Sequence, residues 1–189
     1  MLDPNHKSKS AGVFGMALFI ASLTVLFIAS VVIYLIVRTR SEAWPPPGAP
    51  RIPPLLIVNT IILLISSATM HTANSGIKTG RTGALKFGLT ATTALGLAFL
   101  AGQAVVWHRL IALGLPPGSN LYAFSFYWLT GLHAAHVIGG IALMLVVTRA
   151  AFLGRYSKIN HPGVTYAAMY WHFLDAVWIA LFLLIFVFG

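Results

Sequence analysis

Two pairs of ionisable side chains lie inside long apolar stretches of the sequence, where a charge is costly. Asp175 follows His172 by three residues, a spacing that places both side chains on one face of a helix. An ionised side chain at the centre of a bilayer costs at least about 2.5 kcal/mol, so it needs a partner or a function. The pair therefore predicts either a carboxyl group that relays protons or a buried hydrogen-bonded pair that fastens two helices together.

The second pair, His133 and His136, has the same spacing in an earlier apolar stretch. Two imidazoles placed in this way are able to bind one metal ion or the iron of a haem. A metal site needs further ligands, however, and the only acidic residues are Asp3, Glu42 and Asp175. A carboxylate-bridged two-metal site is therefore excluded. Hydrogen bonding between helices is the favoured interpretation of the pair, and ligation is the alternative.

Other chemistry is limited by what the sequence lacks. Without cysteine the chain has no disulfide, thiolate zinc site, iron–sulfur cluster or thiolate copper centre. It also has no glycine-rich phosphate loop, nucleophile elbow or paired-carboxylate arrangement. Two amides inside apolar stretches, Asn59 and Gln103, are interpreted as interhelical hydrogen-bond donors. No reaction is expected on this chain itself.

The elements that hold these side chains are predicted from five apolar stretches. The composition is 58% hydrophobic and 8% charged, whereas soluble domains have about 25% charged residues. An apolar helix of about 20 residues spans the hydrocarbon core of a bilayer with its backbone groups paired. The expected spans are residues 13–37, 55–73, 85–107, 122–148 and 164–188. We therefore expect an all-α polytopic membrane bundle of five transmembrane helices, forming a single membrane domain over residues 1–189.

Small residues within these spans predict close packing of helices. Gly131, Ala135 and Gly139 recur at intervals of four in the fourth span, which lets another helix backbone approach. A second cluster of small residues occurs in the third span, at Gly96, Ala98, Ala101 and Gly102. No internal repeat is found, so an inverted-repeat transporter has no support.

Basic residues predict the orientation of the bundle. The net charge is +9, and eight lysines and arginines flank the side that holds the N-terminus, whereas four flank the other side. The positive-inside rule then places the N-terminus in the cytoplasm and, after five crossings, the C-terminus outside. Because the cations lie at helix ends, the charge does not indicate nucleic acid binding.

Two motifs in the fourth and fifth spans resemble cytochrome oxidase subunit III. Residues 130–140 read TGLHAAHVIGG, which is similar to the family's Thr-Gly-x-His-x-x-His-Val-x-x-Gly. Residues 170–178 read YWHFLDAVW, which is similar to its Tyr-Trp-His-Phe-x-Asp-x-Val-Trp. Weaker resemblances extend over the first three spans and the proline-rich connector. Five spans with an inside N-terminus correspond to the short bacterial form, which lacks the two additional N-terminal helices of the long form.

Two positions depart from the family pattern. Members commonly have an intramembrane Glu directly after Ser22, where this chain has Leu23, and often have a Glu in the third span where this chain has Val106. Because of these two departures, the proton-uptake role of the family's glutamates is not carried over to this chain. Asp175 remains the sole acid in the middle of a predicted span.

The resemblance implies a non-catalytic subunit of a proton-translocating cytochrome c oxidase in the bacterial inner membrane. The implied partners are a haem-bearing catalytic subunit I, a copper-bearing subunit II and membrane phospholipids bound in a cleft between helix groups, with no nucleic acid. Haems and copper would lie in those partners, and no cofactor is expected here. The polar cluster would act by packing and hydrogen bonding to sustain proton-coupled oxygen reduction; it comprises Asn59, Gln103, His133, His136, His172 and Asp175.

Three alternatives remain open on the sequence. The first is a related subunit of a quinol oxidase or nitric oxide reductase, which the neighbouring subunits would distinguish. The second is a free-standing membrane haem protein with His133, His136 and His172 as ligands, which a visible spectrum of the purified chain would test. The third is a small transporter whose gate contains Asp175, which would show uptake in vesicles.

Overall fold

The computed structural model describes residues 4–187, and five long helices account for most of that part of the chain. They are α1 (Pro4–Arg40), α2 (Leu55–Lys78), α3 (Thr82–Ala112), α4 (Leu121–Phe152) and α5 (Pro162–Phe182), which continues as a π-helical segment, η1 (Leu183–Val187). Each contains a window long and apolar enough to cross a membrane. The all-α bundle of five spans is confirmed. The helices extend past several of the expected ends, and the expected end at residue 188 lies outside the described residues.

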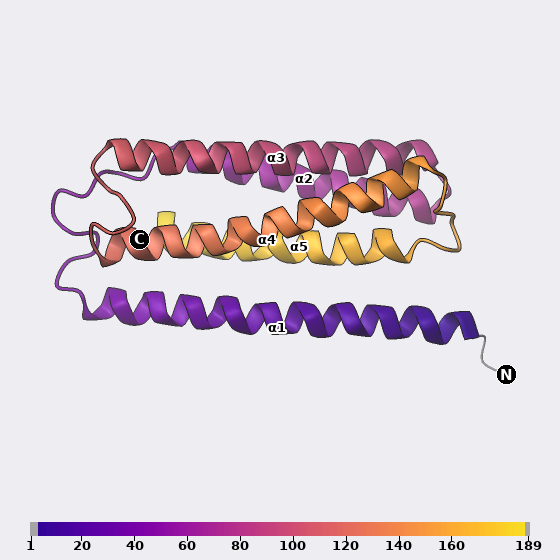
Figure 1. Cartoon of the computed structure of the whole chain (residues 1–189), viewed down its shortest axis with the longest axis horizontal. Helices are drawn as coiled ribbons and strands as arrows, with labels where there is room; N and C mark the ends of the chain where they lie inside the picture. Colours follow the sequence, from indigo (N-terminus) through magenta and orange to yellow (C-terminus); the bar gives the residue numbers. More distant parts are fainter. Residues whose placement is uncertain (1–3, 188–189) are drawn as a thin grey trace.

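The helices lie side by side and alternate in direction, with α1 along one edge of the bundle (Figure 1). The most extensive contact is between α2 and α3, whereas α1 meets α5 and α4. Gly88 explains the close α2–α3 approach, because a Cβ atom there would lie 2.6 Å from the carbonyl oxygen of Thr69 and 2.7 Å from the backbone nitrogen of Ala73. The backbones of these two helices are therefore in direct contact at this point.

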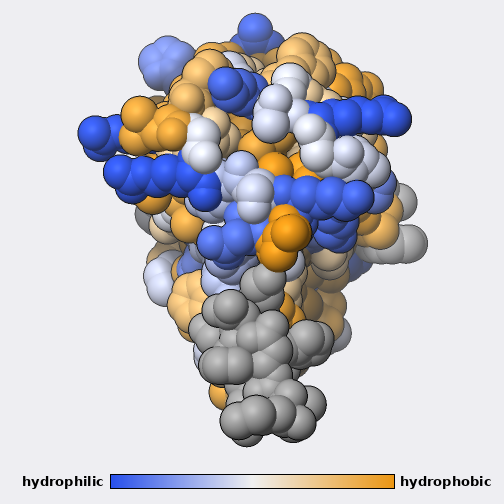
Figure 2. All heavy atoms as spheres, turned by 90° about the vertical axis from the view of Figure 1, so that its right-hand side faces the viewer, coloured by the Kyte–Doolittle hydropathy of each residue, from blue (hydrophilic) through white to orange (hydrophobic). Residues whose placement is uncertain are grey.

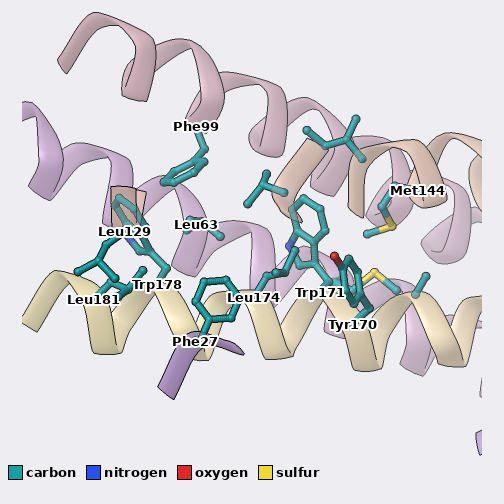
Figure 3. Packing of buried hydrophobic residues seen from close by; sticks show 14 of the residues in the cluster. Phe27, Leu63, Phe99, Leu129, Met144, Tyr170, Trp171, Leu174, Trp178 and Leu181 are labelled. Atoms are coloured by element: carbon teal, nitrogen blue, oxygen red, sulfur yellow. The ribbon is translucent and has the colours of Figure 1, made fainter. Parts of the chain in front are cut away.

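Large aromatic and aliphatic side chains fill the space between α2, α3, α4 and α5. The largest fully buried side chains include Trp171 and Trp178 of α5, Phe99 of α3 and Phe126 of α4. Figure 3 shows Trp171 and Trp178 directed from α5 towards the other helices. By contrast, much of α1 presents apolar side chains outward, as a helix in contact with lipid does.

The ends of the helices are set by local signals. At the C-terminus of α2, Gly80 adopts a φ of 79°, and the amide of Arg81 donates to the carbonyl oxygen of Gly76 at 2.8 Å. This is a Schellman ending, which pairs the last carbonyl groups of the helix and favours glycine. At the N-terminus of α4, the side chain of Asn120 accepts a hydrogen bond from the amide of Ala123 at 2.8 Å.

One end of the bundle is strongly hydrophilic. Figure 2 looks onto the end where α1 begins and where the α2–α3 and α4–α5 loops lie, and hydrophilic side chains gather there. We call it the cationic end; its described lysines and arginines are Lys78, Arg81, Lys86, Arg149, Arg155 and Lys158. The opposite end has Arg38, Arg40, Arg51 and Arg109.

Candidate polar site within the bundle

Side-chain hydrogen bonds join α2 to α5 at two levels. The indole Nε1 groups of two tryptophans donate to hydroxyl groups of α2, and a third contact joins a serine to a histidine. They are Trp171 to Ser66 Oγ at 3.0 Å, Trp178 to Thr60 Oγ1 at 3.0 Å, and Ser67 Oγ with His172 Nδ1 at 2.9 Å. Hydrogen bonds between polar side chains help to hold helices together inside a bilayer.

Asp175 is a buried carboxyl group beside His172. Its Oδ2 lies 3.6 Å from His172 Nδ1, and its side chain is 7% exposed, against 39% for His172. Within residues 4–187, neither carboxyl oxygen of Asp175 has a partner that meets hydrogen-bond geometry. The structure thus brings the two residues together, as the spacing predicts, with Ser67 of α2 as a third member. The role of the pair remains a prediction.

The two histidines of α4 lie in different surroundings. His133 is fully buried, and neither ring nitrogen has a hydrogen-bond partner among the described residues. Its ring contacts those of Phe99, at 5.8 Å between centroids, and Trp178, at 5.1 Å. His136 is partly exposed, and its Nδ1 lies 2.7 Å from the carbonyl oxygen of Leu132 in its own helix. His133 is therefore part of the aromatic core.

Interhelical hydrogen bonds from these imidazoles are not seen within residues 4–187. The bond that links this part of α4 to α5 uses the backbone instead, because the hydroxyl of Tyr170 donates to the carbonyl oxygen of His136 at 3.1 Å. Across the same residues, no three His, Asp or Glu side chains converge as a metal-binding group.

The side chains of Asn59 in α2 and Gln103 in α3 are both buried. Asn59 lies against Gly102 of α3 so closely that a Cβ atom at Gly102 would overlap its side-chain oxygen. Both amides lack hydrogen-bond partners in the described part of the chain. Asn59 thus lies at a contact between α2 and α3, and the donor role of both amides stays a prediction.

The small residues of α4 face away from this chain. Apart from the backbone of α4 itself, a Cβ atom at Gly131 would have no described atom within 4 Å, and one at Gly139 would have the Tyr170 hydroxyl at 3.8 Å. Ala135, between them, is exposed. The glycine of α4 that packs inside is Gly140, where a Cβ atom would lie 3.2 Å from Trp171.

Several contacts of the site were missed by sequence reasoning. Ser66, Ser67 and Thr60 are the hydroxyl partners on α2, and the only signal for them was the greater polarity of this span. Trp107 of α3, which donates to Thr130 Oγ1 at 3.1 Å, was also missed. Hydroxyl groups in a membrane span commonly bond their own backbone, so their interhelical partners depend on the register of the helices.

Comparison with known proteins agrees with the two motifs. The family model of cytochrome c oxidase subunit III matches residues 5–189. The chain is 41% identical over 186 residues to cytochrome c oxidase subunit 3 of Synechocystis sp., covering 96% of this chain and 78% of that protein. It is 34% identical over 187 residues to the Thermostichus vulcanus protein of the same name, covering 98% and 92%. It is also 34% identical over 190 residues to cytochrome bo(3) ubiquinol oxidase subunit 3 of Pseudomonas aeruginosa, covering 99% and 90%.

Proposed function

This chain belongs to the cytochrome c oxidase subunit III family, and from that membership we propose that it stands beside the haem-bearing subunit I of its oxidase as a non-catalytic partner. It is a multi-pass membrane protein and the third subunit of a haem-copper oxidase. We take residues 1–189 as one membrane domain. Haems and copper are assigned to subunits I and II, and this chain keeps the complex assembled during sustained turnover.

The observation that carries this role is the way the interior of the bundle uses its polar groups. The tryptophans of α5 bond to hydroxyl groups of α2, and the His133 ring lies among aromatic rings. These contacts stabilise helix packing and leave the imidazole of His133 enclosed in the core rather than open to a ligand. The arrangement supports a structural subunit rather than a redox centre.

The outward small residues of α4 offer a surface for another subunit. Lipid-facing helices usually present bulky apolar side chains, as α1 does with Phe14, whereas small residues let helix backbones approach. Gly131, Ala135 and Gly139 lie on one face of α4 and have space in front of them. We assign this face to contact with a transmembrane helix of subunit I.

Phospholipid is the proposed occupant of the spaces beside α1. An apolar cavity of about 450 Å³ lies between α1 and α5, lined by residues that include Phe27, Val31, Phe173 and Val177. A second cavity of about 220 Å³ lies between α1 and α4. An apolar space at this depth in a bilayer suits an acyl chain, because the surrounding solvent is lipid.

The orientation follows from the charge difference between the two ends. The N-terminus and two loops at the cationic end have eight lysines and arginines, against four at the other end. The proposed topology therefore has the N-terminus in the cytoplasm and the C-terminus outside, in the inner membrane of a bacterium.

The proposed electron donor of the complex is cytochrome c. The Synechocystis relative, named a cytochrome c oxidase subunit, is 41% identical, whereas the Pseudomonas aeruginosa relative, named a ubiquinol oxidase subunit, is 34% identical. A quinol oxidase is the second candidate, because both relatives are matched over nearly the whole of this chain.

Purification of the complex tests the accessory role directly. A tag at the N-terminus, mild detergent, a visible spectrum and identification of the co-purified subunits are sufficient. A haem-bearing subunit in the eluate, with no haem on this chain after separation, is the expected result. A chain that elutes alone contradicts it: with a stoichiometric Soret band it would be a haem protein, and without colour a transporter. A copper-bearing second subunit identifies the cytochrome c enzyme.

A further inference from the structure

One face of α2 is polar from the cationic end of the bundle to its middle. Going inward from Lys78, this face presents Asn74, His71 and Ser67, at intervals of four, three and four residues, so all four side chains share one side of the helix. Ser67 lies about 16 Å from Lys78 along the helix axis at 1.5 Å per residue. We call these four residues the α2 polar face.

The inner end of this face meets the buried carboxyl group. Ser67 Oγ lies 2.9 Å from His172 Nδ1, and the same nitrogen lies 3.6 Å from Asp175 Oδ2. Lys78 and His71 are exposed, Asn74, Ser67 and His172 are partly exposed, and Asp175 is buried. The contacts from Ser67 through His172 thus join the inner end of the α2 polar face to the buried Asp175.

The other helices supply few ionisable groups near Asp175. α4 contributes His133 and His136, both of which contact the ring of Phe27 in α1. The lysines and arginines whose side chains are described lie near helix ends or in loops. Among the described residues, His172 is the only basic residue with a nitrogen within 4 Å of the Asp175 carboxylate. His172 is therefore the group best placed to exchange a proton with Asp175.

An imidazole that is 39% exposed near the middle of a membrane span is unfavourable against lipid. Ionisable side chains at this depth face the interior of a bundle or a water-filled space. His71 lies one turn closer to the cationic end, near the predicted end of the span at residue 73, and its exposed side chain continues the polar surface outward. Water along this side of α2 would remove the cost at His172.

We propose that the α2 polar face lines a hydrated route by which Asp175 exchanges protons with the aqueous phase at the cationic end. His172 accepts a proton on one ring nitrogen and releases the other from Nδ1 to the Asp175 carboxylate, so the imidazole returns to its neutral form. Asp175 loses the proton by the reverse path. The chain thereby holds a proton-accepting group inside the membrane although Leu23 and Val106 are apolar. The inference rests on the proposed function in one respect, because the route is proposed for this chain as it stands in the assembled oxidase.

Introduced thiols test whether water reaches this face. The chain has no cysteine, so any thiol labelling of it reports the substituted position. Ser67→Cys, His71→Cys and Asn74→Cys are treated, in inverted membrane vesicles that contain the oxidase, with a charged, membrane-impermeant methanethiosulfonate. Ala68→Cys is the control at the depth of Ser67, and Ile65→Cys is the control on the opposite, exposed side of α2. Labelling is read from the mass of this chain.

A hydrated route predicts labelling of the three polar positions at least about tenfold faster than the controls, because the reagent needs water and an ionised thiol. Equal rates at all five positions overturn the proposal. So does labelling that begins only when the complex is dissociated, since a partner helix then covers the face without water. Co-purification of haem-bearing subunits is scored on the same vesicles, so loss of the accessory role is seen separately from loss of the route.

Infrared spectroscopy tests the proton exchange itself. The band of the Asp175 carboxyl group is identified by its loss in Asp175→Asn, and its rate of deuteration is followed in the intact oxidase. Ser67→Ala is expected to slow deuteration several-fold, because the hydroxyl beside His172 is lost. Thr72→Ala, on the exposed side of α2, is expected to leave it unchanged. An unchanged rate in Ser67→Ala overturns the route even where the variant folds and assembles normally.

Discussion

The indole Nε1 of Trp171 donates a hydrogen bond of 3.0 Å to the hydroxyl of Ser66, which joins the middle of α5 to the middle of α2. The same indole ring is held from the other sides by glycines, because Cβ atoms at Gly96 of α3 and Gly140 of α4 would lie 2.6 Å and 3.2 Å from it. One side chain thus contacts three helices. It gives the bundle a fixed register at this level.

Gly96→Ala is expected to lower the thermal stability of the chain in its complex. The added methyl group would lie 2.6 Å from Trp171, which is fully buried and cannot move without disturbing its neighbours. Overpacking of this kind costs about 1–3 kcal/mol. Gly83→Ala, in the same helix, is the control, because among the described residues outside the α3 backbone no atom lies within 4 Å of its new Cβ. Equal melting temperatures for the two variants would show that the ring has room to shift.

Ser66→Ala should weaken the attachment of α5 by removing the acceptor of the Trp171 indole. The indole N–H would then be buried without a partner, at a cost of about 1–3 kcal/mol. Retention of native structure at increasing denaturant concentration measures the effect. Thr72→Ala is matched to it, because that exposed hydroxyl donates to the carbonyl oxygen of Ala68 in its own helix. The idea fails if both substitutions shift the midpoint alike.

Asn59 and Gly102 should show strong coupling in a double-mutant cycle. Gly102→Ala alone places a methyl group on the side-chain oxygen of Asn59 and is expected to destabilise the α2–α3 contact. Asn59→Ala removes the clashing atoms, so the double variant should recover much of the loss. The expected interaction energy is about 0.5–3 kcal/mol. Additive effects in unfolding experiments would mean that the amide moves aside at no cost.

The sequence predicts the spans well because hydropathy depends on residues that are adjacent in the chain. Leu55 is the start of the second span both in the prediction and in α2. The prediction ends that span at Ala73, whereas the helix continues to Lys78, because helices extend through polar residues such as Asn74 and Ser75 at a membrane surface. Local hydropathy therefore underestimates the length of a helix that leaves the bilayer.

Contacts between helices are harder to predict, because they depend on register. The spacing of His172 and Asp175 correctly places them side by side, but Ser67 is 105 residues away in sequence and no local pattern joins it to His172. The interval between Gly131 and Gly139 predicts close approach of another helix, which stays a prediction. It does not reveal that this surface points outward while Gly140 packs against Trp171.

Asp175→Ala is expected to shorten the turnover lifetime of the oxidase or to loosen the association of this chain. The substitution removes the buried carboxyl group beside His172 and leaves a small void between α5 and α2. Activity is followed over many turnovers, together with the amount of this chain that stays with the complex after detergent washing. Asp175→Asn keeps the volume and removes the charge, so it separates packing from proton exchange. Unchanged assembly and lifetime in Asp175→Ala would refute a role for this residue.

Ala135→Phe tests whether α4 docks against another subunit. Ala135 is exposed, and among the described residues outside the α4 backbone no atom lies within 4 Å of a Cβ added at Gly131, so the larger ring is expected to leave the fold of this chain intact. In the complex it would separate two helices that small residues hold close, and co-purification with the haem-bearing subunit should fall. Leu18→Phe, on the exposed apolar side of α1, should leave co-purification unchanged. If both variants retain the haem-bearing subunit equally, this face of α4 meets lipid, and the contact with subunit I lies on another helix.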